Sequence, residues 1–221
     1  MKAGVVLSGC GVMDGSEIHE AVLTMLCLDR QGLETVCMAP NENQADVVNH
    51  LTNAAAAGET RNILQESARI ARGAVTDMAG IQAADIDLLI FPGGFGAAKN
   101  LCSFAADGAG CRVAPEAERL IIAMADAGKP IGALCIAPVL IARVLGGRGQ
   151  RVQVTIGSDP GVAKAINAMG AEHVECPVNE AVIDRACRVA TAPAYMLAKS
   201  IKDVADSAEA LVRGLLELGG N

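Results

Sequence analysis

The sequence predicts an α/β fold in which helices cover both faces of a mostly parallel sheet. First, short apolar runs alternate with longer segments of helical period along the chain, as repeated strand–helix–strand units require. Second, the short runs are continuously apolar, as strands buried on both faces are. Third, 221 residues, of which 52% are hydrophobic, suffice for one domain with a full core.

The elements follow one another in a regular order. Strands are expected at residues 5–7, 35–38, 88–91, 131–134, 152–156 and 188–191, because each is a short apolar run. Helices are expected at 17–31, 97–104, 116–127, 136–145, 161–169 and 196–218, where apolar residues recur at helical spacing. Residues 41–80 fit least, since 41–60 are polar and alanine-rich and 63–72 look helical. We therefore expect one domain over 1–221 with a helical insertion near 41–80, at a site rim or an oligomer contact.

Composition excludes several classes of partner. The net charge is −7, aromatic residues make up 2% and there is no Trp, which argues against binding of nucleic acid. No apolar run approaches the roughly 18 residues of a membrane span. Eight cysteines are scattered through a chain that is large enough to fold without disulfide bonds. This predicts reduced thiols and a cytoplasmic protein. Such an apolar, alanine-rich chain favours a homo-oligomer, and we expect a homodimer.

Cys135 lies at the junction between the apolar run 131–134 and the following helix, which stops at Gly146 and Gly147. A sharp strand-to-helix turn with a nucleophile at its apex is a nucleophile elbow, and it needs small neighbours such as Ala133 and Ala137. The start of a helix also favours a thiolate and is expected to lower the pKa of the thiol. The alternative is that Cys135 is a small buried core residue.

Glu17 follows the first strand and opens the first helix. With Asp14 three residues earlier it has the spacing of a capping box, which is a structural role. Its alternative role is chemical, because ligands of open parallel sheets bind beyond the carboxyl ends of the strands. If the first strand and the strand before Cys135 are neighbours, Glu17 and Cys135 share a pocket.

Glycines follow the third strand, in Pro92-Gly93-Gly94-Phe95-Gly96. Glycines at such a position let backbone N–H groups point into a cavity, as donors to an oxyanion must. The alternative is an ordinary turn between a strand and a helix.

Two further motifs fall short of a cofactor or metal site. The loop Gly9-Cys10-Gly11 follows a strand, but Asp14 occupies the third glycine position of a dinucleotide site and no acid ends the second strand. The helix start His19-Glu20 resembles a zincin motif, but Leu23 replaces the required second His. We expect no cofactor and no metal.

Together these pieces resemble the ThiJ/PfpI superfamily, whose fold is that of class I glutamine amidotransferases, and most closely its ElbB branch, the enhancing lycopene biosynthesis or ElbB glyoxalase proteins. The resemblance covers essentially the whole chain. It is carried by Ser8-Gly9-Cys10-Gly11, Asp14-Gly15-Ser16-Glu17-Ile18-His19-Glu20, Asn49-His50-Leu51, Pro92-Gly93-Gly94, Gly96-Ala97-Ala98-Lys99-Asn100-Leu101, Ala133-Leu134-Cys135-Ile136-Ala137-Pro138, Gly170-Ala171-Glu172-His173-Val174 and Thr191-Ala192-Pro193-Ala194-Tyr195-Met196.

The resemblance implies a flavodoxin-like three-layer sandwich with Cys135 as nucleophile, Glu17 as its carboxylate partner, and the N–H groups of Gly94 and Ile136 as oxyanion donors. It also implies a cofactor-independent glyoxalase that converts small 2-oxoaldehydes, such as glyoxal to glycolate, by covalent catalysis. Ile136 stands where relatives with a full triad carry a His, which argues against a glutaminase or peptidase. The alternative is a redox-responsive or regulatory binding protein linked to isoprenoid metabolism, with little or no turnover.

Overall fold

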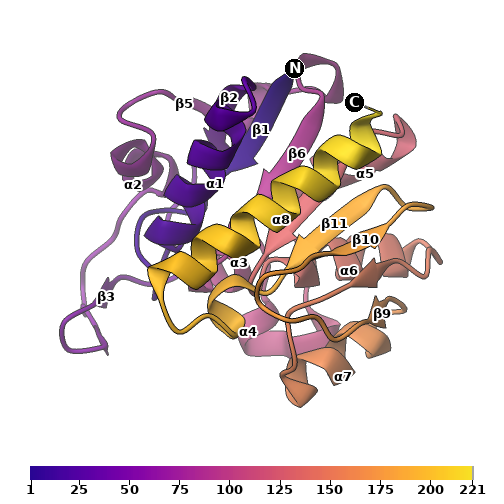
Figure 1. Cartoon of the computed structure of the whole chain (residues 1–221). Helices are drawn as coiled ribbons and strands as arrows, with labels where there is room; N and C mark the ends of the chain where they lie inside the picture. The colour runs from indigo at the N-terminus through magenta and orange to yellow at the C-terminus, as the bar shows by residue number, and fades with distance from the viewer. Residues whose placement is uncertain (221) are drawn as a thin grey trace.

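The computed structural model describes residues 1–220 and is built around a seven-stranded sheet (Figure 1). The strand order is β10-β11-β7-β6-β1-β2-β5. All neighbours pair in parallel except β10 and β11, which pair antiparallel at one edge. The strands are β1 (Lys2–Val6), β2 (Glu34–Ala39), β5 (Val75–Asp77), β6 (Leu88–Phe91), β7 (Ile131–Leu134), β10 (Val182–Asp184) and β11 (Val189–Ala192).

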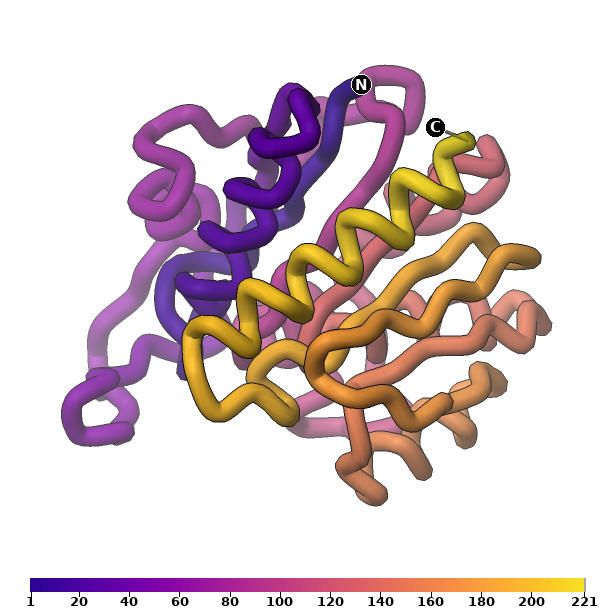
Figure 2. The backbone as a smooth tube through the Cα atoms, in the orientation of Figure 1, coloured from indigo at the N-terminus to yellow at the C-terminus, as the bar shows by residue number. Residues whose placement is uncertain are grey.

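Helices cover both faces of this sheet, as the sequence predicts. On the face toward the viewer in Figures 1 and 2, the first and last helices lie over the strands, and Ala21 and Leu28 share a buried cluster with Leu211 and Leu215. The cluster on the other face includes Leu120 and residues of the helix after Cys135. The helices are α1 (Ile18–Arg30), α2 (Ile63–Ile70), α3 (Phe95–Lys99), α4 (Phe104–Asp107), α5 (Pro115–Asp126), α6 (Pro138–Gly147), α7 (Pro160–Ala168) and α8 (Ile201–Gly219).

Two expected elements differ from the structure. The strand expected at 152–156 is reduced to β8 (Gln153–Val154), which pairs with β9 (Glu172–His173) outside the main sheet. Its continuation meets β11 through a side chain, because the Thr155 N–H donates to Thr191 Oγ1 at 2.8 Å. The helix expected at 97–104 is broken into α3 and α4, because the Asn100 side chain turns away to donate to the carbonyls of Ser8 and Asp14.

The segment 41–80 holds more than a helix. A two-stranded hairpin, β3 (Val48–Asn49) and β4 (Ala54–Ala55), precedes α2, and β5 then joins the sheet beside β2. Short 3₁₀ turns lie at Met78–Gly80, Ala83–Asp85, Gly108–Gly110 and Ala194–Met196. We propose that residues 1–221 form a single domain. The two buried clusters support this, because they pack on opposite faces of one sheet.

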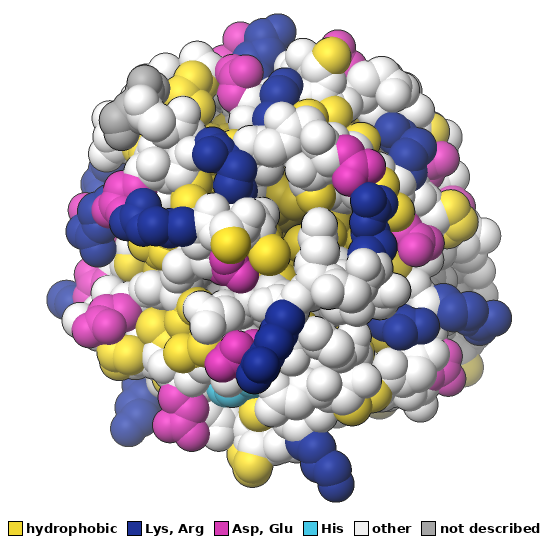
Figure 3. Space-filling model, turned by 90° about the vertical axis from the view of Figure 1, so that its right-hand side faces the viewer, with side chains coloured by type: hydrophobic (Ala, Val, Ile, Leu, Met, Phe, Trp, Pro, Cys, Tyr) yellow, Lys and Arg dark blue, Asp and Glu magenta, His cyan; other side chains and the backbone are white. Residues whose placement is uncertain are grey.

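The face in Figure 3 shows basic and acidic side chains interspersed over the surface, with apolar side chains between them. Among residues 1–220, no helix combines the length and the hydropathy needed to cross a membrane.

Candidate active site

Cys135 occupies a strained turn between β7 and α6. Its φ of +59° lies in the left-handed region, which a residue other than glycine adopts only where the surrounding structure holds it there. The Cys135 N–H donates to the Ala192 carbonyl at 3.0 Å, which anchors the turn to β11. The side chain is only 8% exposed. The structure therefore has the geometry of a nucleophile elbow, with the thiol at the carboxyl edge of the sheet.

Two backbone N–H groups point at this thiol. They belong to Gly94, just after β6, and to Ile136, which follows the cysteine. Gly94 has a φ of +97°, and a Cβ there would lie 2.4 Å from the Glu17 nitrogen, so only glycine fits. The structure thus brings together the three positions Cys135, Gly94 and Ile136 that the sequence places at one site.

The carboxylate beside Cys135 is Glu20. Its side chain is fully buried and is hydrogen-bonded to the Cys135 thiol. Its two oxygens accept backbone N–H groups, Oε2 from Gly93 at 2.9 Å and Oε1 from Tyr195 at 3.1 Å. These two hydrogen bonds, one from the end of β6 and one from the segment after β11, fix the position of the carboxyl group beside the sulfur.

Glu17, predicted as the partner of Cys135, lies in a different position. It is the N-cap of α1, and its Oε2 accepts the Glu20 N–H at 2.7 Å. The premise of the prediction was wrong, because β6 lies between β1 and β7 in the sheet. The capping box with Asp14 is not formed either, since Asp14 accepts the Val48 N–H at 2.8 Å. Glu20, one turn further along α1, spans the distance to the thiol.

A pattern in the sequence marks Glu20 in retrospect. Glu20, Thr24 and Leu28 recur every four residues on the buried face of α1. A carboxylate on an otherwise apolar or small-residue face has to find partners in the interior, because an unpaired buried charge is costly. Glu17 was predicted instead because it lies just past the first strand and because the family resemblance implied it, whereas the buried face of α1 points to Glu20.

Burial sets the protonation of this pair. Burial, against the lowering effect of the Tyr195 N–H and with a smaller contribution from the Glu17 charge, raises the pKa of Glu20 to about 7. Burial and the Glu20 charge raise the pKa of the Cys135 thiol well above its usual range, against the N–H groups of Gly94 and Ile136. The expectation of a lowered thiol pKa is therefore wrong. The pair holds a proton at neutral pH.

Gly93 allows this close packing. A Cβ at that position would lie 2.4 Å from the Cys135 Cβ and 2.5 Å from Glu20 Oε2. Its carbonyl accepts the Glu17 N–H at 2.9 Å, while its own N–H binds Glu20. The end of β6 therefore joins α1 to the elbow.

The three histidines of the chain are engaged with other groups. His19 Nδ1 is hydrogen-bonded to the Tyr195 hydroxyl at 2.7 Å, and the His19 side chain is half-exposed. His50 Nε2 accepts the Met13 N–H at 3.1 Å, and His173 Nε2 lies 3.4 Å from the Ile156 nitrogen. Within residues 1–220, no Cys–His–acid triad is assembled at Cys135.

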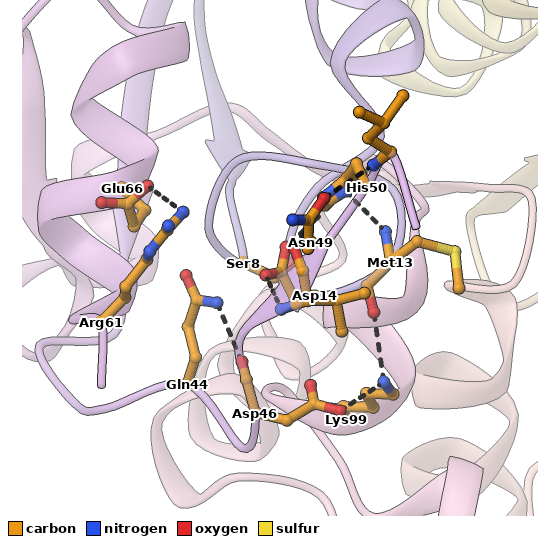
Figure 4. A network of polar contacts seen from close by, with 12 residues as sticks. Ser8, Met13, Asp14, Gln44, Asp46, Asn49, His50, Arg61, Glu66 and Lys99 are labelled. Carbon is orange, nitrogen blue, oxygen red and sulfur yellow. Dashed lines mark hydrogen bonds and ion pairs between the residues drawn. The ribbon is translucent and has the colours of Figure 1, made fainter. Parts of the chain in front are cut away.

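The loop after β1 is covered by the segment 41–62 (Figure 4). A Cβ at Gly11 would lie 2.5 Å from His50 Nε2, so the glycine admits this ring. Lys99 donates to the Met13 carbonyl at 3.1 Å and pairs with Asp46 at 2.8 Å, as the dashed lines of Figure 4 show. Segment 41–62 thus packs against the loop that precedes Glu17 and is hydrogen-bonded to it. Residues 1–220 contain no group of three or more His, Cys, Asp or Glu side chains placed to hold a metal ion.

Comparison with known proteins identifies relatives along the whole chain. A human "glutamine amidotransferase-like class 1 domain-containing protein 3, mitochondrial" is 47% identical over 99% of this chain and 84% of its own length. The rat "ES1 protein homolog, mitochondrial" is 45% identical over the same shares. A solved structure from Ehrlichia chaffeensis, called an isoprenoid biosynthesis protein with amidotransferase-like domain, is 41% identical, covers 99% of both chains and has a TM-score of 0.92. No protein-family model matches the chain.

More distant structures share the fold alone. Glyoxalase III from Candida albicans has a TM-score of 0.63 at 14% identity, over 97% of each chain. Drosophila melanogaster DJ-1beta has a TM-score of 0.55 at 17% identity, over 99% of this chain and 95% of its own. These matches confirm the predicted flavodoxin-like, class I glutamine amidotransferase-like fold.

The relatives also correct one prediction. The human, rat and zebrafish proteins are all named as mitochondrial, which contradicts the cytoplasmic location inferred from the cysteine content. Reduced cysteines do not distinguish the cytoplasm from other reducing compartments, so that inference was too narrow. From these relatives, the chain belongs to the family of glutamine amidotransferase-like class 1 domain-containing (ES1) proteins.

Proposed function

We propose that the protein is a cofactor-independent glyoxalase that converts small 2-oxoaldehydes into 2-hydroxy acids, with glyoxal giving glycolate. The observation that carries the proposal is the convergence of the Cys135 thiol, the buried Glu20 carboxyl and the N–H groups of Gly94 and Ile136. A nucleophile, a proton carrier titrating near neutral pH and two oxyanion donors are the groups that addition to an aldehyde needs. The fold shared with a glyoxalase III agrees with this proposal.

In the first step, Cys135 Sγ adds to the aldehyde carbon while Glu20 accepts the thiol proton. A carboxylate with a pKa of about 7 matches this role, because it takes and returns a proton near neutral pH. The N–H groups of Gly94 and Ile136, which bind the sulfur in the free protein, then turn to the new oxyanion. The product is a hemithioacetal on Cys135.

In the second step, Glu20 carries a proton between the two former carbonyl carbons through an enediol. The hemithioacetal carbon loses its proton and the neighbouring carbon gains one, which leaves a thioester of the hydroxy acid on Cys135. Water then attacks the thioester carbonyl, the C–S bond breaks, and the thiol regains its proton. The low exposure of Cys135, 8%, favours a small substrate.

Proton NMR in D₂O, without glutathione or metal, tests the proposal. The wild-type protein is expected to convert glyoxal to glycolate that carries solvent deuterium on carbon, because the Glu20 proton exchanges with solvent. Cys135→Ser is expected to lose the activity, since an alcohol at this position is a far weaker nucleophile. Wild-type protein that forms no glycolate above the Cys135→Ser background would disprove the glyoxalase proposal.

The second candidate, a redox-responsive or regulatory protein linked to isoprenoid metabolism, has one observation in its favour. Glu20, with a pKa of about 7, carries a proton part of the time at neutral pH and so has an O–H to donate to an oxidised Cys135 sulfur. Under this alternative, peroxide converts Cys135 to a stable sulfinate while glyoxal is not turned over. Mass spectrometry of the peptide that contains Cys135 distinguishes the two candidates.

We also propose a homodimer. Ile18, Val22 and Leu26 lie four residues apart along α1 and are 43%, 44% and 39% exposed, an apolar row that a second copy would cover. Sedimentation of the wild type is expected to give a dimer and that of Val22→Glu a monomer. A wild-type monomer at micromolar concentration would contradict the proposal.

A further inference from the structure

The turn that follows β11 has a strained backbone next to the Cys135 site. Ala194 has a φ of +43°, in the left-handed region that a residue other than glycine rarely adopts. Its N–H donates to the Ser207 Oγ of α8 at 2.9 Å, and Ser207 is fully buried. A backbone strained in this way keeps its shape only where neighbouring groups hold it. The side of the turn that faces α1 is occupied by Tyr195.

Two adjacent residues of α1 bind the two ends of Tyr195. The Tyr195 N–H donates to Glu20 Oε1 at 3.1 Å, and the Tyr195 hydroxyl is hydrogen-bonded to His19 Nδ1 at 2.7 Å. The two rings are also close, with centroids 5.9 Å apart. The first turn of α1 therefore contacts both the main chain and the side chain of one residue in the strained turn.

The contact between His19 and Tyr195 does not need one particular protonation state of the imidazole. A neutral His19 with its proton on Nε2 accepts the Tyr195 O–H, and a protonated His19 donates to the same oxygen. Burial, with smaller contributions from the charges of Glu17 and Glu20, raises the pKa of Tyr195, which keeps its hydroxyl protonated. The contact is therefore available throughout the pH range in which Glu20 titrates.

The two N–H donors to the Glu20 carboxyl group are held in different ways. Gly93 follows the fully buried strand β6, and its surroundings leave no room even for a Cβ. Tyr195 is only half-buried and lies in a turn outside the sheet. The hydrogen bond to His19 gives this second donor a fixed place relative to α1, which the sheet gives to Gly93.

We propose that His19 and Tyr195 are positioning residues for Glu20. Their side-chain contact holds the turn after β11 against α1, so that the Tyr195 N–H stays on Glu20 Oε1 and the carboxyl group stays beside the Cys135 sulfur. Without the contact the strained turn relaxes and Oε1 loses its donor. The proposal concerns the Cys135–Glu20 pair itself, so it does not depend on turnover of glyoxal.

The titration of the Glu20 carboxyl group tests this proposal. An N–H donor lowers the pKa of a carboxyl group because it stabilises the charged form. Tyr195→Phe removes only a hydroxyl oxygen and leaves Glu17, His19 and Cys135, the other titratable groups around the site, in place. It is expected to raise the Glu20 midpoint above its wild-type value of about 7 by about 0.5–1 unit, as partial loss of a charge-assisted hydrogen bond implies.

Carbon-13 NMR of labelled glutamate carboxyl groups measures this midpoint, with the Glu20 signal assigned by its loss in Glu20→Gln. In the wild type, the amide proton of Tyr195 is expected to shift with the same midpoint, because its N–H is bonded to the titrating group. This response is expected to weaken in Tyr195→Phe. A substitution that only loosens the fold would not change the link between these two signals.

A second variant and a control separate the contact from general destabilisation. His19→Ala, at a half-exposed position, is also expected to raise the Glu20 midpoint, and it decides the question if Tyr195→Phe fails to fold. The double variant is expected to go no further than the larger single shift, because both substitutions remove one contact. Asp159→Ala removes the N-cap of α7 and is expected to lower stability without moving the midpoint.

An unchanged Glu20 midpoint in Tyr195→Phe would overturn the proposal, as would single shifts that add in the double variant. A midpoint that moves as far in Asp159→Ala would do the same, because loss of stability alone would then explain the shift. The measurement uses no substrate. A wild-type protein that fails to convert glyoxal therefore disproves the glyoxalase proposal and leaves the positioning role of His19 and Tyr195 intact.

Discussion

Among single residues, Glu20 has the strongest influence on Cys135, through its charge and through the proton the two groups share. Because the carboxylate raises the pKa of the thiol, Glu20→Gln is expected to lower that pKa and so to speed alkylation of Cys135 by iodoacetamide near neutral pH. Rates measured from pH 6 to pH 10 by peptide mass spectrometry check this. A slower reaction of Cys135 in Glu20→Gln would show that the Glu20 charge does not raise the pKa of the thiol.

At this scale the sequence identifies some positions and misses others for a physical reason. Cys135 was found because an elbow is a local feature that follows directly from neighbouring residues, whereas the family resemblance implied Gly94 and Ile136 as oxyanion donors. The buried face of α1 marks Glu20 as an interior residue, but its contact with Cys135 depends on which strands lie side by side, and the sequence does not contain that order. The raised pKa of Cys135 was missed for the same reason, since burial and Glu20 are tertiary effects.

At the scale of elements, the end of β6 connects α1 to the elbow through Gly93. Gly93→Ala would place a Cβ 2.4 Å from the Cys135 Cβ, so backbone has to shift. We expect the free energy of unfolding to fall by about 1–3 kcal/mol, as overpacking does, and glyoxal turnover to be lost. Gly80→Ala is the matched control, because a Cβ there meets nothing within 4 Å. Urea unfolding of both variants checks the comparison, and equal stability of the two would show that the packing at Gly93 is not tight.

The sequence predicts correctly the central strands in which every residue is buried, and it fails for the segment beside the edge of the main sheet. Strands β6 and β7 match the sequence prediction, because their four residues are fully buried. The strand expected at 152–156 failed because its apolar residues pack beside β11 without joining the main sheet. Apolar runs indicate burial, and burial does not require ladder pairing.

For the whole molecule, the raised pKa of Glu20 predicts a pH dependence of stability. Because the folded protein binds this proton more tightly than the unfolded chain, the contribution is full below about pH 4.5 and is lost as pH rises through about 7. The contribution of this group to the free energy of unfolding falls with rising pH across that window, by on the order of 3 kcal/mol.

Unfolding curves of the wild type and Glu20→Gln from pH 4.5 to pH 8 measure this slope. The variant is expected to have a flatter dependence, whatever constant offset the lost carboxylate hydrogen bonds cause. Glu34→Gln, at an exposed position, is the control and is expected to keep the wild-type slope. Parallel curves for the wild type and Glu20→Gln would show that Glu20 titrates alike in the folded and unfolded states.

Glyoxal turnover by Glu20→Gln and Glu17→Gln, measured side by side with the wild type, tests most directly that Glu20 and Cys135 are the reacting pair. Glu20 contacts the thiol, while Glu17 caps α1. We predict that Glu20→Gln loses on the order of a hundredfold or more in kcat, as loss of a positioned acid–base group does, and that Glu17→Gln keeps most of the activity with a slightly lower melting temperature. Near-wild-type kcat in Glu20→Gln, with loss of activity in Glu17→Gln, would contradict the account.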